Sequence, residues 1–281
     1  MTTADVASVR AAWAEAFDAL RARSGLPPDG HTEESAARED RRIRHLLTTD
    51  PEGSWVAERA GTVVGGAQAL RREGLWVLAH LGVSPGAQGG GLGRNLLEKT
   101  LTYGSRDEPG LILSSRDPRA ISSYALAGFR LHPTVTARGV VKRAGLGAVE
   151  NVRKGSANDL ERAAMIDRTR RGAAHGPDLQ HMLGGGAEML VVEDRGYVVH
   201  AGGRPLVLAA IDADVAGRLL TAALAEAPAD AMLEINWVTA EQHWAITIAV
   251  AAGLDLQPHG PVMVRGAPGP LAPYLFSGPF G

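Results

Sequence analysis

The segment at residues 78–101 reads LAHLGVSPGAQGGGLGRNLLEKTL. Its apolar beginning predicts a strand that ends before Pro85, and its spaced leucines predict a helix over residues 90–103. Glycines fill the space between the two. The first amides of a helix have no intrahelical partners, and the helix start carries a partial positive charge. The segment therefore predicts a strand, loop and helix that bind an anion through backbone amides.

The spacing of the glycines limits which anion is expected. The dinucleotide fingerprint G-x-G-x-x-G does not fit, because Arg94 and Leu96 stand where the third glycine would be. The chain also has no G-K-S/T sequence of the kind that binds nucleotides in P-loop proteins. Both common nucleotide-binding loops are therefore excluded.

The segments on either side predict a mixed α/β fold, α+β in its sheet arrangement, in which helices flank a central mixed sheet. Helical and strand periodicities alternate along the first half. The expected helices cover residues 4–23, 33–47, 90–103 and 119–127, and the expected strands cover residues 54–58, 62–70, 75–83, 111–115 and 129–141.

Two motifs resemble those of the GNAT superfamily of N-acyltransferases. Residues 83–94, VSPGAQGGGLGR, are similar to its Q/R-x-x-G-x-G/A signature through Gln88, Gly91 and Gly93. Residues 117–129, DPRAISSYALAGF, resemble its N-x-x-A-x-x-x-Y-x-x-x-G-F element. The chain differs from this element at Asp117, where the family usually has Asn. The residue at this position commonly contacts the pantetheine arm in the family, so the resemblance does not establish that contact here. The resemblance covers residues 1–141 and continues more weakly over 151–265.

The resemblance implies acetyl-CoA as cosubstrate. In the family, backbone groups at the end of the strand pair with the pantetheine arm, and amides of the glycine loop bind the pyrophosphate. The cofactor-binding residues implied in this chain are Leu81, Gly82, Val83, Gln88, Gly89, Gly90, Gly91, Leu92, Gly93, Arg94, Ser115, Asp117 and Tyr124.

Tyr124 is the catalytic residue that the resemblance implies. Attack of an amine on a thioester expels a thiolate, and in the family the tyrosine at this place protonates it. A tyrosine hydroxyl suits this role, because its pKa of about 10 keeps it protonated at neutral pH, whereas a thiol has a pKa of about 8.5.

The sequence leaves the general base open. Strand alternation directs Val77 and Ala79 toward the cofactor face and His80 toward the other face. The candidates are Glu58, Glu73, His45, His80 or a water relay. Ser114 and Ser115, at the end of an expected strand, either position the substrate or have no role in the reaction.

The second half repeats the first without its chemistry. Glu58 and Gly61 align with Glu193 and Gly196, and the 117–129 element aligns with residues 242–254. Asp212 and Asp214 stand where the glycine loop should be, and Ala249 takes the tyrosine position. We therefore expect a duplicated domain that binds one CoA per chain.

The expected domain organisation follows from this duplication. Residues 1–141 form an active GNAT domain, 142–150 a linker, 151–265 a degenerate GNAT-like domain and 266–281 a Pro/Gly-rich tail. Compared with the family that it resembles, the first copy is expected to lack its first strand. We expect residues 273–280 to supply a substitute edge strand to it.

Composition excludes several classes of protein. The chain has 281 residues, no cysteine and a net charge of −2, so no disulfide framework, thiol nucleophile or basic nucleic-acid surface is expected. No segment predicts a signal peptide or a membrane span, and no histidine spacing predicts a metal site. We expect a cytoplasmic monomer or homodimer.

These features together predict an acetyl-CoA-dependent N-acetyltransferase. The acetyl group would move to a primary amine of a small molecule, or to a protein amine, by direct attack on the thioester. The alternative is a CoA- or acyl-CoA-binding sensor, a pseudoenzyme without turnover. A third hypothesis is a structural interaction module that binds no CoA.

Overall fold

A computed structural model describes residues 1–28, 30–105 and 107–281. The chain divides into two compact units, Met1–Glu108 and Pro109–Gly281. Each unit is a part of the chain whose residues contact one another more than they contact the other part. The duplication boundary at residues 142–150, which was inferred from sequence repeats, stays a prediction.

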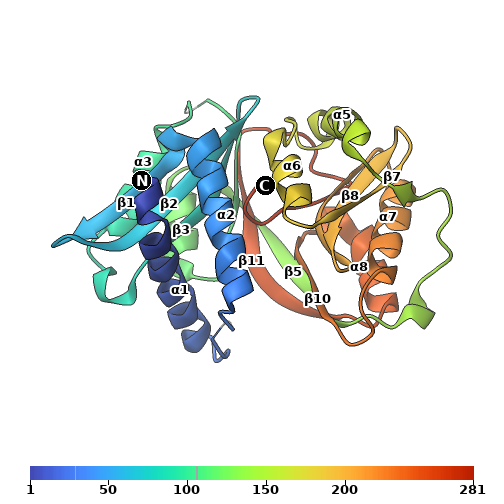
Figure 1. Ribbon diagram of the computed structural model, residues 1–281, viewed down its shortest axis with the longest axis horizontal. Helices are drawn as coiled ribbons and strands as arrows, with labels where there is room; N and C mark the ends of the chain where they lie inside the picture. Colours follow the sequence, from blue (N-terminus) through green and yellow to red (C-terminus); the bar gives the residue numbers. More distant parts are fainter. Residues whose placement is uncertain (29, 106) are drawn as a thin grey trace. The chain divides into compact units, whose positions relative to one another are not determined.

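The first unit is a three-stranded antiparallel sheet flanked by helices. Its strands run in the order β1-β2-β3, with α1 and α2 on one face and α3 on the other (Figure 1). The elements are α1 (Val6–Arg23), α2 (Glu33–Thr49), β1 (Ser54–Arg59), β2 (Thr62–Arg72), β3 (Leu75–Val83) and α3 (Leu92–Leu101), with 3₁₀ turns at Thr3–Asp5, Pro51–Gly53 and Pro85–Ala87. The elements predicted for this part are confirmed.

Trp13 fixes α1 on the sheet. Its side chain is 1% exposed, and its Nε1 donates a 2.9 Å hydrogen bond to the carbonyl oxygen of Gly66. A Cβ atom at Gly82 would lie 2.6 Å from the Trp13 ring. Only glycine therefore lets the helix approach β3 this closely.

A β-bulge in β3 changes which way its side chains face. Gln68 pairs with His80, but the next residue of β2 pairs with Leu78, so Ala79 is the extra residue. Trp76 donates to the carbonyl of Thr100 at the end of α3, whereas His80 lies against α1. Since neighbours in a strand face opposite sides, Val77 faces away from α3. Val77 and His80, which were expected on opposite faces of the strand, therefore lie on the same face.

The second unit contains two groups of antiparallel strands. One runs β4-β11-β5-β10 and the other β12-β9-β8-β7-β6. The strands are β4 (Gly110–Leu113), β5 (Arg130–Val140), β6 (Arg153–Lys154), β7 (Glu188–Val192), β8 (Gly196–Ala201), β9 (Arg204–Ala210), β10 (Met232–Val238), β11 (Asp255–Arg265) and β12 (Tyr274–Leu275). The helices are α4 (Pro118–Leu126), α5 (Leu160–Arg170), α6 (Pro177–Gly184), α7 (Ala213–Ala225) and α8 (His243–Ala251), with 3₁₀ turns at Arg143–Gly145, Ala157–Asp159 and Ala240–Gln242.

Helices cover both faces of β7, β8 and β9 (Figure 1). A Cβ atom at Gly196 would touch α7, whereas the next residue, Tyr197, bonds to Asp167 of α5. The expected class, mixed α/β with helices flanking two sheets, is therefore confirmed, and it agrees with tandem GNAT-like domains.

The two predicted repeats share a sheet. Strand β11, from the second repeat, lies between β4 and β5 of the first. Val262 pairs with Leu113 on one side and with His132 on the other. The helices that precede the last strand of each repeat also match. Asp117 and Gln242 are their N-cap residues, and each is followed by a left-handed glycine, Gly128 or Gly253.

The prediction for the tail is wrong. Residues 274–275 form β12, which pairs with β9 of the second unit. Leu275 joins the apolar core of that unit. Tyr274 is fully buried, and its hydroxyl contacts the ring of His175 at 3.2 Å. The apolar tail thus finds both its strand partner and its buried polar partners within the second unit.

Candidate active site

The glycine loop follows β3 and is tied back to it. The side-chain amide of Gln88 donates a 2.7 Å hydrogen bond to the carbonyl oxygen of Val83. Gly89 and Gly91 have φ values of 90° and 79°, in the left-handed region that favours glycine. Gly91 is the N-cap residue of α3 and offers no side chain to the helix amides.

The start of α3 is open to an anion. The backbone amide of Asn95 donates to Gly91, so the amides of Leu92, Gly93 and Arg94 come before this first intrahelical bond. The first turn contains no acidic residue. A Cβ atom at Gly90 would meet nothing within 4 Å. The exposed loop therefore fits a phosphate group by its chemistry and by the space around it.

The corresponding helix of the second repeat, α7, starts differently. Its N-cap residue Asp212 accepts a 2.9 Å hydrogen bond from the amide of Val215 and pairs with Arg195 at 2.7 Å. The Val215 amide, more than Arg195, lowers the pKa of Asp212. A carboxylate thus occupies the place that an anion would need. This favours the prediction of one CoA per chain.

The end of β3 supplies the predicted pantetheine contacts. Leu81 and Val83 face α3, since their side chains lie 3.9 Å from the position of a Cβ atom at Gly93. Gly82 faces Trp13 on the other side. The first unit thus brings together the predicted residues at 81–83 and 88–94.

The remaining predicted residues lie together in the second unit. Asp117 caps α4 by accepting a 3.0 Å bond from the amide of Arg119, whose guanidinium lies 2.7 Å from the same carboxylate. Ser115 Oγ accepts from the amide of Asp117 at 3.3 Å. The side chains of both predicted contact residues thus already help to start this helix.

Sequence reasoning missed Trp237 of β10. Its indole Nε1 donates a 3.1 Å hydrogen bond to the carbonyl oxygen of Ser114, just after β4. The hydroxyl of Ser114 itself donates to Ser115 at 2.8 Å. Trp237 has a φ of 53°, which is strained for a bulky residue. No sequence pattern indicated this conformation, since it arises at an irregularity in the pairing of β10 with β5.

Tyr124 lies on α4, and the residue is 6% exposed. No hydrogen bond of its hydroxyl is found among the residues that the structure describes. Burial, followed by the negative charge of Asp117, raises the pKa of Tyr124 above its usual value. The phenol is therefore protonated at neutral pH, as a proton donor to a thiolate must be.

The structure separates the candidates for the general base. Glu73 lies in the turn before β3, and the glycine loop follows β3, so about 30 Å of strand lies between them. Glu58 is exposed on β1, and His45 is half-buried on α2. His80 lies between the rings of Trp13 and Phe17, with centroids 3.9 and 5.1 Å away.

Arg42 is a second residue that sequence reasoning missed. It lies on α2 beside the buried residue Ile43, and its Nη2 is 3.3 Å from His80 Nδ1. The sequence feature that could have pointed to Arg42 is a basic residue next to the apolar positions of an amphipathic helix. One sequence cannot show whether such a cation reaches the solvent or a partner.

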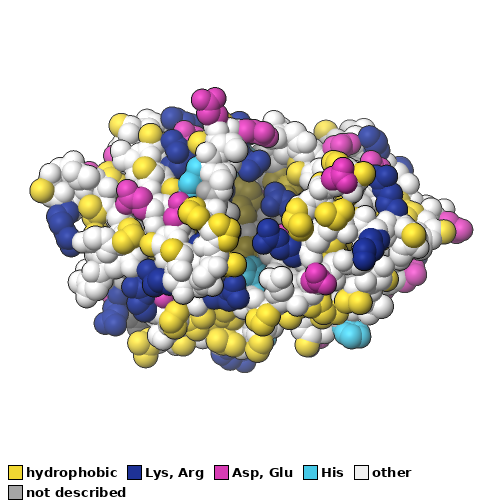
Figure 2. All heavy atoms as spheres, turned by 90° about the horizontal axis from the view of Figure 1, so that it is seen from below, with side chains coloured by type: hydrophobic (Ala, Val, Ile, Leu, Met, Phe, Trp, Pro, Cys, Tyr) yellow, Lys and Arg dark blue, Asp and Glu magenta, His cyan; other side chains and the backbone are white. Residues whose placement is uncertain are grey.

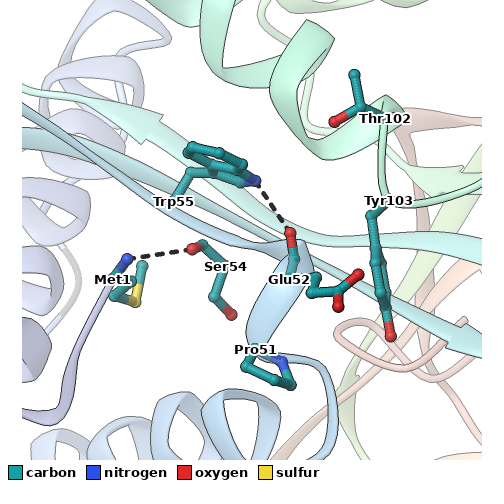
Figure 3. A pocket seen from close by; sticks show the side chains of 7 residues that line it. All are labelled: Met1, Pro51, Glu52, Ser54, Trp55, Thr102 and Tyr103. Carbon is teal, nitrogen blue, oxygen red and sulfur yellow. Dashed lines mark hydrogen bonds between the residues drawn. The ribbon is translucent and has the colours of Figure 1, made fainter.

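A separate cavity of about 450 Å³ lies in the first unit (Figure 3). Met1, Glu52, Trp55 and Tyr103 are among its lining residues, and Trp55 Nε1 donates to the backbone of Glu52. The cavity contains none of the predicted site residues. It lies after the C-terminal end of α3, whereas the glycine loop precedes the N-terminal end.

Within residues 1–28, 30–105 and 107–281, no three or more His, Asp or Glu side chains are grouped so that they could hold a metal ion. None of the helices in these ranges is long and apolar enough to cross a membrane. Acidic and basic side chains are interspersed on the face drawn in Figure 2.

Comparisons with known proteins agree with the motifs. The family described as acetyltransferase (GNAT) matches residues 13–129. A mycothiol acetyltransferase from Streptomyces avermitilis is 36% identical over 92 residues, which is 30% of this chain and 29% of that protein. The chain thus matches less than a third of the length of this curated relative.

Solved structures resemble the chain over more of its length. A putative acetyltransferase from Pyrococcus horikoshii has a TM-score of 0.77 at 17% identity, covering 100% of this chain and 94% of that one. A tandem GNAT protein from the clavulanic acid biosynthesis pathway has a TM-score of 0.51 at 15% identity, covering 81% and 88%. At these identities, the likeness shows the fold.

The glycine loop and Tyr124 both lie within the segment that matches the acetyltransferase (GNAT) family. The family match covers residues 13–129, and the solved structures show that the chain shares its fold with a putative acetyltransferase and with a tandem GNAT protein.

Proposed function

We propose that the chain is an acetyl-CoA-dependent N-acetyltransferase whose acceptor is a primary amine, most simply that of a small molecule. The observation that carries the proposal is the open start of α3, where amides of residues 92–94 precede the first helix bond and no acidic side chain is present. That arrangement suits the pyrophosphate of CoA. The match of residues 13–129 to the acetyltransferase (GNAT) family supports acyl transfer.

Acetyl-CoA supplies the acyl group as an activated thioester. In the proposed reaction, the amine attacks the thioester carbon, the bond from carbon to sulfur breaks, and the acetylated amine loses a proton. The backbone at residues 81–83 and the loop at 88–94 bind the donor. Ser115 and Asp117 contribute further contacts, and the hydroxyl of Tyr124 gives its proton to the departing sulfur. We propose that the first repeat alone binds CoA.

Calorimetric titration of acetyl-CoA tests the binding step. Gly90→Glu places a carboxylate in the loop without backbone strain or a clash, because Gly90 lacks a positive φ and its Cβ direction is open. Gly86→Glu adds the same charge four residues earlier, at a position with equal space. We expect one site per chain in the wild type and in Gly86→Glu, and a large loss of affinity in Gly90→Glu.

Turnover is then measured as free thiol released when amines are added. Thiol release that depends on an amine supports the enzyme. Acetyl-CoA binding without such release would favour the sensor. Absence of binding would leave the loop without a ligand and would favour the interaction module.

A further inference from the structure

The face of the first sheet that lies under α1 and α2 holds an unusual polar pair. Arg42 of α2 extends to His80 of β3, with Nη2 and Nδ1 3.3 Å apart. Trp13 and Phe17 of α1 pack on the imidazole. Because His80 faces away from α3, this pair lies on the opposite side of the sheet from the helix that begins at the glycine loop.

The contact with Arg42 fixes the tautomer of His80. A guanidinium has only donors, so Nδ1 of His80 must accept and cannot carry a proton. The proton of the neutral ring is then on Nε2. Burial, and then the charge of Arg42, lowers the pKa of His80 well below its usual value, which keeps the ring neutral. His80 therefore presents a single N–H donor.

One further nitrogen of each residue in the pair lacks a partner. His80 Nε2 and Arg42 Nε are both buried, and neither has a hydrogen-bond partner among the described residues. Over those residues, no ion pair of Arg42 is found, and Asp40, two positions away on the same helix, pairs with Arg10 at 2.7 Å. The nearby charges are Glu39, which raises the pKa of Arg42, and Arg38, which lowers it less strongly. Burial has the largest effect and lowers it overall.

Arg42 as a whole is half-buried, but its Nε is fully buried, and a buried donor of a charged group is costly unless an anion or other acceptor compensates it. Here both unpartnered atoms are donors, and one belongs to a guanidinium. The group that would satisfy these two donors is therefore a negatively charged hydrogen-bond acceptor. A neutral hydroxyl or amide would satisfy one donor and leave the charge uncompensated.

We propose that Arg42 and His80 bind an anionic oxygen, carboxylate or phosphate, carried by the acceptor substrate. This inference rests on the proposed function for its link to the acceptor. The glycine loop is assigned to the donor, and Arg42 and His80 lie under α1 and α2, on the other face of the sheet. The acceptor class is then an amine that bears an acidic group.

The same geometry gives His80 a role other than general base. In its neutral form, Nδ1 already accepts from Arg42 and Nε2 already carries a proton. No free lone pair is left to take a proton from the amine. His80 is thus a specificity-determining donor, and the proton of the amine must leave by another route.

The test uses the full chain and small anions as probes. Long-range ¹H–¹⁵N spectra of the histidine rings report the tautomer, and His80→Gln identifies the signals of His80. Sodium acetate, inorganic phosphate and neutral acetamide are titrated separately. Arg42→Gln removes the charge, and Arg44→Gln is the matched control, because Arg44 is exposed on the same helix.

We expect His80 to be protonated at Nε2 and its signal to shift saturably with an anion. Affinity for acetamide should be weaker by about tenfold or more, as loss of a charge-assisted bond implies. Arg42→Gln should abolish this preference, and Arg44→Gln should keep it. The ratio of acetate to phosphate affinity identifies which anion the site prefers. A proton on Nδ1, equal binding of acetamide, or a preference that persists in Arg42→Gln would each overturn the proposal.

Acetyl-CoA titration of the same proteins separates the two proposals. If acetyl-CoA does not bind, the proposed function fails, while the anion titrations still report on Arg42 and His80. Conversely, if acetyl-CoA binds normally but the protein shows no preference for an anion, only the proposal that the acceptor is an amine with an acidic group is rejected.

Discussion

The side-chain amide of Gln88 and the carbonyl oxygen of Val83 are joined by a 2.7 Å hydrogen bond. This bond ties the start of the glycine loop to the end of β3. It holds the two predicted CoA-binding segments of the first unit in one arrangement. If the loop binds CoA as proposed, the side chain of Gln88 acts on it through the loop, as a positioning group.

Replacement of Gln88 by leucine should weaken acetyl-CoA binding without unfolding the protein. The bond lost contributes about 1 kcal/mol, which corresponds to roughly a fivefold to tenfold rise in Kd. Asn95→Leu is the matched control, since Asn95 is an exposed amide on α3. Calorimetry of both variants tests this, and an unchanged Kd in Gln88→Leu would show that the loop keeps its form without the bond.

Tyr124→Phe should lower kcat by about 10²-fold or more, the usual contribution of a general acid, and leave the Kd of acetyl-CoA nearly unchanged. Since burial and Asp117 raise the pKa of Tyr124, the phenol keeps its proton as pH rises through neutrality. The wild-type rate should therefore show no loss from this group below about pH 10. Tyr103→Phe, in the first unit, serves as the control for hydroxyl removal. Equal kcat in wild type and Tyr124→Phe would remove the tyrosine from the mechanism.

Asp50 and Arg72 form a buried ion pair in the first unit. The two side chains are 0% and 7% exposed, with Nη1 and Oδ1 2.9 Å apart. The hydroxyl of Tyr103 donates to the same carboxylate oxygen at 3.0 Å. Burial first, and then the charge of Asp50, raises the pKa of Tyr103 to about 12, so this donor keeps its proton.

Asp50→Asn should destabilise the protein by about 3–5 kcal/mol, because it leaves the charge of Arg72 buried without a counter-charge. The double variant Asp50→Asn with Arg72→Met should recover part of this loss, since it removes the unpaired charge as well. Urea unfolding of the three proteins measures both effects. Additive losses in the double variant would mean that the two side chains do not interact energetically.

Local pattern was enough to predict most elements of the fold, and tertiary features account for what it missed. The helix of spaced leucines and the strands before it form as expected, since each carries its own periodicity. Val77 and His80 were expected on opposite faces and lie on the same one, because an extra residue, Ala79, breaks strand alternation. The tail was mispredicted because apolar residues show that a segment is buried, without showing against which sheet.

The candidate site was predictable where a motif marks it. The glycine loop and Tyr124 carry family signatures, whereas Arg42 and Trp237 belong to no motif. Arg42 became a candidate site residue only in the structure, where α2 places it against His80. This contact joins residues that are distant in sequence. Trp237 lies even further from the residue that it contacts, Ser114.

The position of β11 leads to a prediction about whether the first repeat can fold without the second. A fragment of residues 1–150 contains β4 and β5 but lacks the strand that lies between them. It would expose unpaired backbone groups on both strands, and these favour aggregation. We expect this fragment to be aggregated or poorly folded by size exclusion and by the dispersion of its amide resonances. Co-expression with residues 151–281, which carry β11, should restore a soluble complex.

The result also tests the expected linker at residues 142–150. A monomeric fragment 1–150 that binds acetyl-CoA as tightly as the whole chain would make the first repeat a self-sufficient domain and β11 dispensable to it. Rescue only by co-expression would mean that the second repeat, although it lacks a glycine loop and a tyrosine at position 249, supplies a strand without which β4 and β5 form no sheet. Its retention would then be explained by folding, independently of any contact with the substrate.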